Sequence, residues 1–302
     1  HCDPTASHYI KTLMDAIFGH KNFLNELVWY YRGAGVPKKA RAKRHDILLC
    51  YTKKMGNHYF DPDPIRRPYA NATVKRFQHH IGNVRGDRDY GTQKLHPLGK
   101  HPDDVIADIQ PIAPSARDRL GYPTQKPIKL LKEIIAASSK AGDIVFDPFC
   151  GCATTIAAAH ELNRRWIGID IAYHAIKRVT QVRLKDDYGL VEGEHYTVTG
   201  VPRTLEGAQS LWRQDKYQFQ RWAVEQVNGF VTVKRTADGG IDGRLYFTWP
   251  GDKQLRSMIL EAKGGRHVGI DTVRKLRGAL ERDKAAMAGL IVMEPLADRK
   301  RQ

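Results

Sequence analysis

The sequence predicts an α/β protein with two units: a parallel β-sheet with crossover helices, followed by a second, smaller α/β unit. Its length of 302 residues exceeds the usual domain size of about 100–200 residues, which favours two domains. Short apolar runs alternate with helical patterns of apolar residues, as is typical of parallel sheets. Hydrophobic residues make up 41% of the chain, a fraction that supports packed cores and disfavours wholesale disorder.

The N-terminal part is expected to contain one helix and two strands. Apolar residues recur at helical spacing from Ile10 to Ile17, and Gly19 ends this helix. Short apolar runs at 27–31 and 47–51 predict β-strands.

Residues 56–120 have an irregular pattern that differs from the rest of this half. The segment is rich in Pro, Gly, His and Arg, with aromatic residues interleaved. A loop of this length in a compact domain is usually either functional or disordered. Two interpretations of segment 56–120 are therefore open: an inserted target-recognition element or a partly disordered loop.

Regular structure is expected again from Tyr122 onwards. A helix that follows a proline ends at Gly142. The alternation of strands and helices after it predicts a Rossmann-like sheet with crossover connections. The expected elements are a strand at 144–147, a helix from about 154 to 162, a strand at 166–170 and a helix through 175–182.

The C-terminal third predicts a small domain of its own. Residues 189–210 mix Gly, Pro, Glu and Thr and are expected to form a linker. The remaining residues, 211–302, are numerous enough to fold alone. Their expected elements are a helix closed by Gly229, strands at 231–234, 245–248 and 258–262, a helix through 273–287 and a strand at 290–293.

The charge of the chain points to a polyanionic partner. There are 49 Lys and Arg residues against 33 Asp and Glu, a formal net charge of +16. Basic side chains gain free energy when they release counterions from a phosphate backbone, so double-stranded DNA is the expected partner. The basic run Lys38–Arg44 and the arginines of segment 56–120 are candidates for phosphate contacts. The sequence is also compatible with a homodimer.

The cysteines and the hydropathy pattern indicate a cytoplasmic protein. Four cysteines in a chain of this size do not form a disulfide scaffold, which favours a reducing compartment. Cys150 and Cys152 lack the spacing of a zinc knuckle or redox pair. No apolar run approaches the ~20 residues that span a membrane, so no membrane association is expected.

The segment Asp147–Thr155 lies where a predicted strand is followed by a predicted helix. Small residues in such a turn let the backbone approach a ligand, and the helix N-terminus offers N–H groups. Asp170 ends the next strand, where βαβ nucleotide folds hold a carboxylate for ribose hydroxyls. The loop is neither G-x-G-x-x-G nor a P-loop, which disfavours a dinucleotide. Taken alone, such a loop is more often a plain tight turn in an α/β sheet.

Together with its neighbours, this loop resembles the D-P-F-x-G-x-G-T-T loop of the amino-methylating DNA methyltransferases, which bind S-adenosylmethionine. Tyr122–Pro127 is similar to the family's T-Q-K-P segment, and Trp166–Asp170 is similar to its second cofactor strand. His1–Ser7 and Lys43–Leu49 resemble two further family segments. The likeness therefore extends over more than half of the chain.

The resemblance implies an S-adenosylmethionine-dependent methyltransferase domain over residues 1–188 that methylates adenine N6 in DNA, with cytosine N4 as the alternative target. Ala153 departs from the family pattern, which usually has glycine there. The residues implied to bind the cofactor are Asp147, Phe149, Gly151, Thr154 and Asp170, with Thr124, Lys126 and Pro127 beside them.

The catalytic tetrapeptide of that family, Asp/Asn/Ser-Pro-Pro-Tyr/Phe, is absent from this sequence. Its polar groups accept hydrogen bonds from the target amino group, and its aromatic residue stacks on the extruded base. In the permuted class of the family it belongs upstream of His1, so we expect an N-terminally truncated chain. Asp3-Pro4 lacks the aromatic residue and is not a substitute.

A second group of candidate residues combines acids and a lysine. Side chains alternate along a strand, so Glu261 and Lys263 are expected on one face. If that strand pairs with the one after Asp242, the carboxylates of Asp242 and Glu261 can share a Mg²⁺ ion. Such an ion, with Lys263 beside it, suits attack of water on a phosphodiester. Glu225, on the preceding helix, is a further candidate.

These residues resemble the catalytic set of the PD-(D/E)xK nucleases, specifically the Mrr-like restriction endonuclease domain. The likeness includes Tyr217–Ala223, Gly239–Gly243 and Val273–Gly278. It implies a Mg²⁺-dependent endonuclease domain over residues 211–302, fused to the methyltransferase in a bacterial restriction–modification system. The alternative is a DNA-binding protein whose nuclease-like domain is catalytically silent. The implied catalytic residues are Asp242, Glu261, Lys263 and Glu225, and the implied metal ligands are Asp242 and Glu261.

Overall fold

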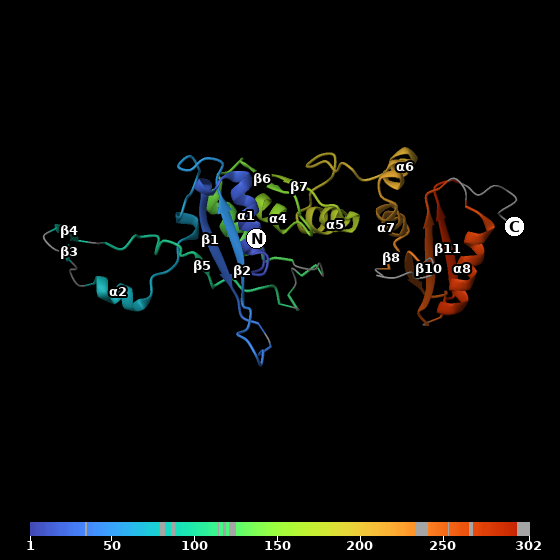
Figure 1. Ribbon diagram of the computed structural model, residues 1–302, viewed down its shortest axis with the longest axis horizontal. Coiled ribbons are helices and arrows are strands. Elements are labelled where there is room, and N and C mark those ends of the chain that lie inside the picture. Colours follow the sequence, from blue (N-terminus) through green and yellow to red (C-terminus); the bar gives the residue numbers. More distant parts are fainter. Residues whose placement is uncertain are drawn as a thin grey trace. The chain divides into compact units, whose positions relative to one another are not determined.

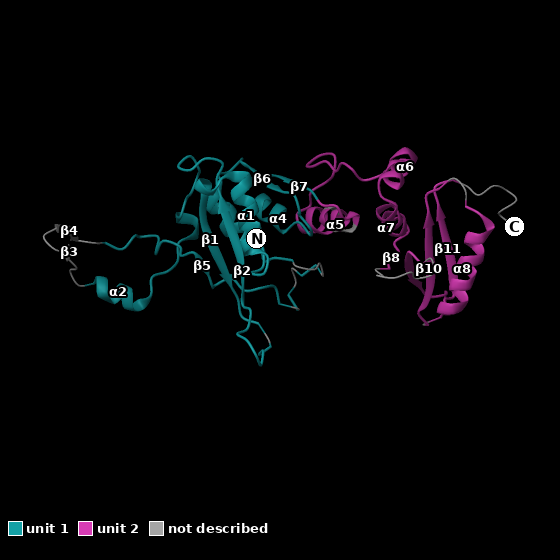
Figure 2. Ribbon diagram, viewed as in Figure 1, with its two compact units in different colours: residues 1–169 teal, residues 170–302 magenta. Residues whose placement is uncertain are grey.

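The computed structural model of the chain contains two compact units, residues 1–169 and residues 170–302 (Figure 2). The predicted domain boundary, with a linker at 189–210, stays a prediction. The structure describes all residues except 34, 79–81, 86–87, 93, 114, 117–118, 121–124, 233–240, 253, 266–267 and 295–302.

The first sheet of unit 1 has the strand order β2-β1-β5 (Figure 1). β1 (Phe23–Tyr30) pairs antiparallel with β2 (His45–Tyr51) and parallel with β5 (Val105–Ile106). Trp29 of β1 is buried in the hydrophobic core beside this sheet. Its indole N–H donates a hydrogen bond of 2.7 Å to the carbonyl of Ile109. The two strands predicted in this region are confirmed, and they form the framework of the local core.

Helix α1 (Ser7–Phe18) ends as predicted at Gly19, which has a φ of 84°. A single 3₁₀ turn, η1 (His20–Asn22), follows it. The apolar stripe of α1 is not buried, because Leu13 and Ile17 are 63% and 74% exposed. Periodicity thus predicts the helix, but it does not tell what the helix packs against.

The segment predicted to be irregular contains short elements joined by loops. They are the 3₁₀ turn η2 (Asp63–Ile65), the helix α2 (Asn71–Phe77), and the strands β3 (Gly82–Arg85) and β4 (Arg88–Thr92). β3 and β4 pair with each other in antiparallel fashion.

The last elements of unit 1 form a strand–helix–strand motif. β6 (Ile144–Asp147) and β7 (Arg165–Gly168) pair in parallel, and α4 (Thr154–Glu161) connects them. α3 (Ile128–Ser138) packs with α4 in a cluster that also contains Val145 and Trp166 of the two strands. The predicted parallel pairing with a crossover helix is therefore present.

Unit 2 contains a four-stranded sheet with the order β11-β10-β9-β8. β10 (Arg256–Lys263) pairs in parallel with β11 (Met287–Val292) and antiparallel with β9 (Gly243–Phe247). β8 (Phe230–Val231) lies at the edge, antiparallel to β9. Part of the strand predicted at 231–234 lies outside the described residues.

Helices cover both faces of this sheet. Ala262 packs with residues of α6 (Leu205–Gln214) and α7 (Lys216–Gln226), whereas Ile259 packs with α8 (Ile270–Asp283). Because alternate residues of a strand point to opposite faces, α6 and α7 lie on one face and α8 on the other. None of the described helices is both long enough and apolar enough to cross a membrane.

Helix α6 begins inside the segment predicted as a linker. The Thr204 hydroxyl accepts a hydrogen bond of 3.2 Å from the N–H of Gly207, and Asp215 caps α7 in the same way. The unit also contains α5 (Tyr173–Arg178) and a helical segment with π-type turns, η3 (Val179–Asp187).

Two glycines of unit 2 give opposite expectations for the same substitution. A Cβ at Gly243 would lie 2.4 Å from Cγ1 of Val224, whereas one at Gly278 in α8 would meet open space. Gly243→Ala should therefore lower the free energy of unfolding by about 1–3 kcal/mol through overpacking. Gly278→Ala should raise it by about 0.5–1 kcal/mol, since alanine favours the helix. Urea titration followed by circular dichroism measures both, and changes of the same sign would contradict this packing.

Candidate functional site

The loop that joins β6 to α4 is held in a tight turn by its own backbone. Oδ1 of Asp147 accepts a hydrogen bond of 3.0 Å from the N–H of Phe149, and the N–H of Cys150 donates one of 2.9 Å to the carbonyl of Ile169. The parallel register places Asp147 opposite Gly168, so the loop starts where both strands end. In α/β sheets, ligands bind beyond such carboxyl ends of parallel strands.

Gly151 and Ala153 both have left-handed backbone conformations in this loop, with φ values of 50° and 61°. Residues with a Cβ atom rarely adopt this conformation, which accounts for the glycine that is usual at the position of Ala153. Ala153 is fully buried, so its methyl group points into the protein. The departure from the family pattern therefore leaves the turn intact.

Burial divides the side chains of the loop into two groups. Phe149 is 87% exposed, whereas Cys150 and Cys152 are 6% and 3% exposed. The thiols therefore pack as small apolar groups rather than as accessible nucleophiles. Thr154, the first residue of α4, is also buried, with its hydroxyl 3.7 Å from the sulfur of Cys152. A ligand at this loop would meet the ring of Phe149 and the half-buried carboxylate of Asp147.

Asp170 directly follows Ile169 and is the first residue of unit 2. Its Oδ1 accepts a hydrogen bond of 2.8 Å from the N–H of Ala172, just before α5 begins. In nucleotide folds a carboxylate that follows the second strand binds ribose hydroxyls, and this role stays a prediction for Asp170.

Lys126 lies near a carboxylate that is distant in the sequence. Its Nζ is 3.6 Å from Oδ2 of Asp46 and 5.8 Å from the centre of the Trp29 ring. Oδ1 of Asp46 also accepts a hydrogen bond of 3.1 Å from the Tyr31 hydroxyl, and Oδ2 lies 2.8 Å from Nε2 of His1. Burial, together with the bond to Asp46, raises the pKa of Tyr31.

The sequence motifs alone do not single out this polar cluster. Asp46 falls inside the segment 43–49 that carries the family resemblance, but only the fold reveals that Lys126 is its partner. Pro127 is buried and precedes the first turn of α3. Thr124 lies outside the described residues.

In unit 2 the structure brings Asp242, Glu261 and Lys263 together. Oε1 of Glu261 forms an ion pair of 2.7 Å with Nζ of Lys263, and Oδ2 of Asp242 accepts a hydrogen bond of 2.7 Å from the N–H of Ala262. Glu261 is only 4% exposed, and its Oε2 has no hydrogen-bond partner within the described part of the chain. Among described residues, no three His, Cys, Asp or Glu side chains converge on one point. If the two carboxylates of Asp242 and Glu261 bound a Mg²⁺ ion, water or phosphate oxygens would fill its other coordination positions.

Glu225 occupies a different environment on α7. Burial raises the pKa of its carboxyl group, and the charges of Lys177 and Arg221 oppose this shift. Nζ of Lys177 lies 3.3 Å from its backbone carbonyl and donates to it. The structure therefore does not bring Glu225 into one group of three acids with Asp242 and Glu261.

Residues 1–181 match a family model described as DNA methylase, the N6/N4 methylase family. The chain belongs to this family. Type II methyltransferase M.EcaI of Enterobacter cloacae is 30% identical over 223 residues, covering 56% of this chain and 49% of the relative. DNA adenine methyltransferase YhdJ of Escherichia coli (strain K12) is 35% identical, covering 51% of this chain and 49% of the relative. The chain spans about half the length of these curated relatives.

Solved structures give a weaker likeness to this DNA methylase chain. The crystal structure of the M1.HpyAVI–SAM complex is 20% identical with a TM-score of 0.38, covering 60% of this chain and 70% of that chain. The cytosine-N4-specific PvuII methyltransferase is 13% identical with a TM-score of 0.41, covering 63% and 58%. The family match ends at residue 181. The nuclease interpretation of residues 211–302 therefore depends on their motifs and on the Asp242–Glu261–Lys263 cluster.

The raised pKa of Glu225 predicts a pH-dependent effect of one substitution. The folded state holds this proton more tightly than the unfolded state, so stability falls as pH rises from the ordinary value of 4.5 through the raised pKa. Glu225→Gln removes this loss of stability, so the variant should melt above the wild type at pH 7 but not at pH 4. Glu281→Gln, at a side chain 67% exposed, is the matched control. Equal differences at both pH values would contradict the assignment.

Proposed function

We propose that the protein is an S-adenosylmethionine-dependent methyltransferase that acts on an exocyclic amino group in double-stranded DNA, as part of a restriction–modification system. The observation that carries the proposal is the turn from Asp147 to Thr154 at the carboxyl end of two parallel strands, in a chain of the DNA methylase family. Adenine N6 is the proposed target, because one relative is named a DNA adenine methyltransferase.

The residues of the turn fit a nucleoside cofactor in chemical terms. The carboxylate of Asp170 suits ribose hydroxyls, and the exposed ring of Phe149 offers a stacking surface. Lys126 and Asp46 provide opposite charges for the amino-acid end of S-adenosylmethionine. When bound, this cofactor supplies an activated methyl group on its sulfonium. Transfer to an amino nitrogen needs no cysteine nucleophile, which agrees with the burial of Cys150 and Cys152.

The DNA would contact basic side chains that the fold leaves exposed. Lys38, Lys39, Arg41 and Lys43 are exposed in the segment before β2. Such residues supply phosphate contacts and salt-dependent affinity but no sequence selection.

Binding of S-adenosylmethionine is the first test, because the printed sequence has no Pro-Pro-aromatic tetrapeptide. Ligand at about 100-fold above its Kd stabilises the folded state by about 2.7 kcal/mol, which should raise the Tm by about 5 °C or more. Asp170→Ala should remove most of this shift, since the ribose hydroxyls lose their acceptor. Asp271→Ala, at a side chain 80% exposed on α8, should leave it unchanged. No Tm shift of the wild type at millimolar ligand would overturn the cofactor assignment.

For unit 2 we propose a Mg²⁺-dependent DNA endonuclease, with a catalytically silent DNA-binding domain as the second candidate. The supporting observation is Glu261, which is buried near Asp242 and Lys263. Its Oε2 has no hydrogen-bond partner among the described residues. Asp242 and Glu261 would hold the ion, which when bound supplies positive charge at the phosphate. The ammonium group of Lys263 would orient a water molecule and stabilise negative charge on the phosphate.

Plasmid cleavage with Mg²⁺ separates these two candidates. Asp242→Asn removes a metal ligand and Lys263→Ala removes a positive charge, so each should slow nicking by about 100-fold or more. Asp271→Asn on exposed α8 is the control and should nick like the wild type. Equal nicking by every variant would exclude the nuclease assignment. Plasmid binding without any nicking by the wild type would favour the silent domain.

A further inference from the structure

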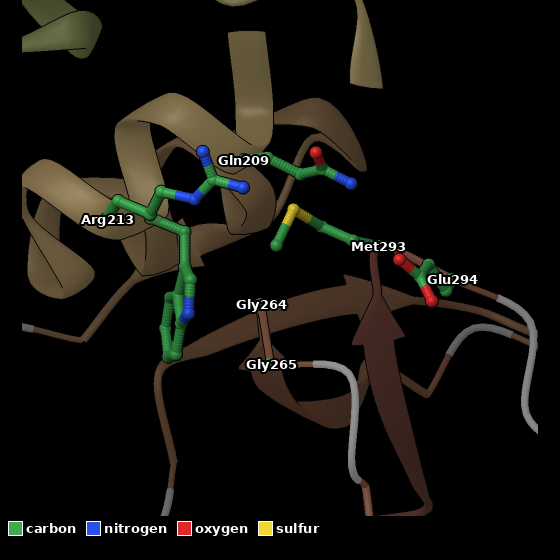
Figure 3. A pocket seen from close by; sticks show the side chains of 7 residues that line it. Gln209, Arg213, Gly264, Gly265, Met293 and Glu294 are labelled. Atoms are coloured by element: carbon green, nitrogen blue, oxygen red, sulfur yellow. The ribbon is translucent and has the colours of Figure 1, made fainter. Parts of the chain in front are cut away.

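A pocket of about 200 Å³ lies in unit 2, between α6 and the carboxyl ends of the parallel strands β10 and β11 (Figure 3). Gln209, Trp212 and Arg213 line it from α6. The Gly264–Gly265 pair after β10, with Met293 and Glu294 after β11, completes the lining. The pocket therefore begins one residue after Lys263 in the sequence, but on the opposite face of the sheet.

One wall of the pocket is the indole ring of Trp212, which is held in place from two sides. A Cβ at Gly264 would lie 2.5 Å from the indole, so the ring packs directly on the backbone of this glycine. Phe219 meets the same ring edge to face, with 5.3 Å between ring centroids. The ring nevertheless stays half-buried, not enclosed. Nζ of Lys216 also lies over this ring, 5.4 Å from its centre, and the part of Trp212 left open lines the pocket.

Polar groups face this aromatic wall from both sides of the pocket. Figure 3 shows the side chains of Gln209 and Arg213 extending from α6, opposite Met293 and Glu294 at the end of β11. Within the described residues, Gln209 and Arg213 have no side-chain hydrogen bond or ion pair. Their amide and guanidinium groups are therefore available to a ligand.

The size and chemistry of the pocket define the ligand. Drug-sized ligands need about 300–1,000 Å³, so this volume suits a single ring system and excludes a dinucleotide. Amide, guanidinium and carboxylate groups are those that read the hydrogen-bonding edges of bases, and aromatic rings hold their faces. The nearby ammonium group of Lys216, 5.4 Å from the centre of the Trp212 ring, suits a phosphate that flanks the base.

We propose that this pocket holds one nucleobase extruded from DNA that is bound at unit 2. The proposal rests on the proposed function, since it takes DNA as the partner. The extruded base packs on the part of Trp212 that lines the pocket, and Gln209 and Arg213 bind its edge. Gly264 faces α6, on the side of the sheet opposite to Glu261 and Lys263, so the pocket holds the base apart from the acidic centre. A base anchored here therefore adds affinity for DNA at unit 2.

Photo-crosslinking with the full chain tests the location. The probe is a DNA duplex with a single unpaired 5-iodouracil, and peptide mass spectrometry identifies the adduct. The expected adduct lies on Trp212 or Met293, and its yield should fall at least fivefold in the double variant Gln209→Ala/Arg213→Ala. Arg277→Ala, at a side chain 80% exposed on α8, is the matched control and should keep the yield. Adducts confined to residues 1–169 would overturn the proposal.

Fluorescence anisotropy tests the energetic contribution of the base. The two probes are a duplex with one unpaired adenine and the same duplex with an abasic site there. Stacking on an aromatic residue should give the wild type at least fivefold higher affinity for the first duplex, and the double variant should bind both alike. Circular dichroism verifies that the variant folds, which alanine in a helix favours. Equal wild-type affinity for both duplexes overturns the pocket assignment alone, whereas binding of neither duplex overturns DNA binding as well.

Discussion

The parallel pairing of β6 with β7 is the constraint from which the shape of the cofactor loop follows. Because Asp147 lies opposite Gly168, both strands end together, and the chain must turn into α4 within residues 148–153. Gly168 permits the turn, since a Cβ there would lie 2.4 Å from Cδ1 of Ile156 and 3.2 Å from the sulfur of Cys150. Backbone contacts therefore set the loop, and its exposed groups are left for a ligand.

The acidic centre of unit 2 follows from a different requirement. A carboxylate removed from water is costly unless a positive charge accompanies it, and Lys263 meets this need for Glu261 at 2.7 Å. Native proteins rarely leave a buried oxygen without a hydrogen-bond partner. Within the described residues, Oε2 of Glu261 is such an oxygen. This feature distinguishes the cluster from the many surface ion pairs that contribute little.

Local patterns in the sequence predicted most of the regular structure but few of its long-range contacts. The apolar runs located β6, β7 and β10, and alternation placed Glu261 and Lys263 on one face, because these are properties of neighbouring residues. The contact of Lys126 with Asp46 joins distant segments, and no periodicity encodes it. Likewise, the helical spacing around Leu13 gives no sign that this side chain is exposed.

The contact between Trp212 and Gly264 limits which residues position 264 can accept during evolution. The indole occupies the volume that any side chain at position 264 would need, so even the smallest such group must displace the ring or the strand end. A mutation there is therefore not a silent change on a loop. Descendants of this gene that keep the tryptophan are therefore expected to keep the glycine.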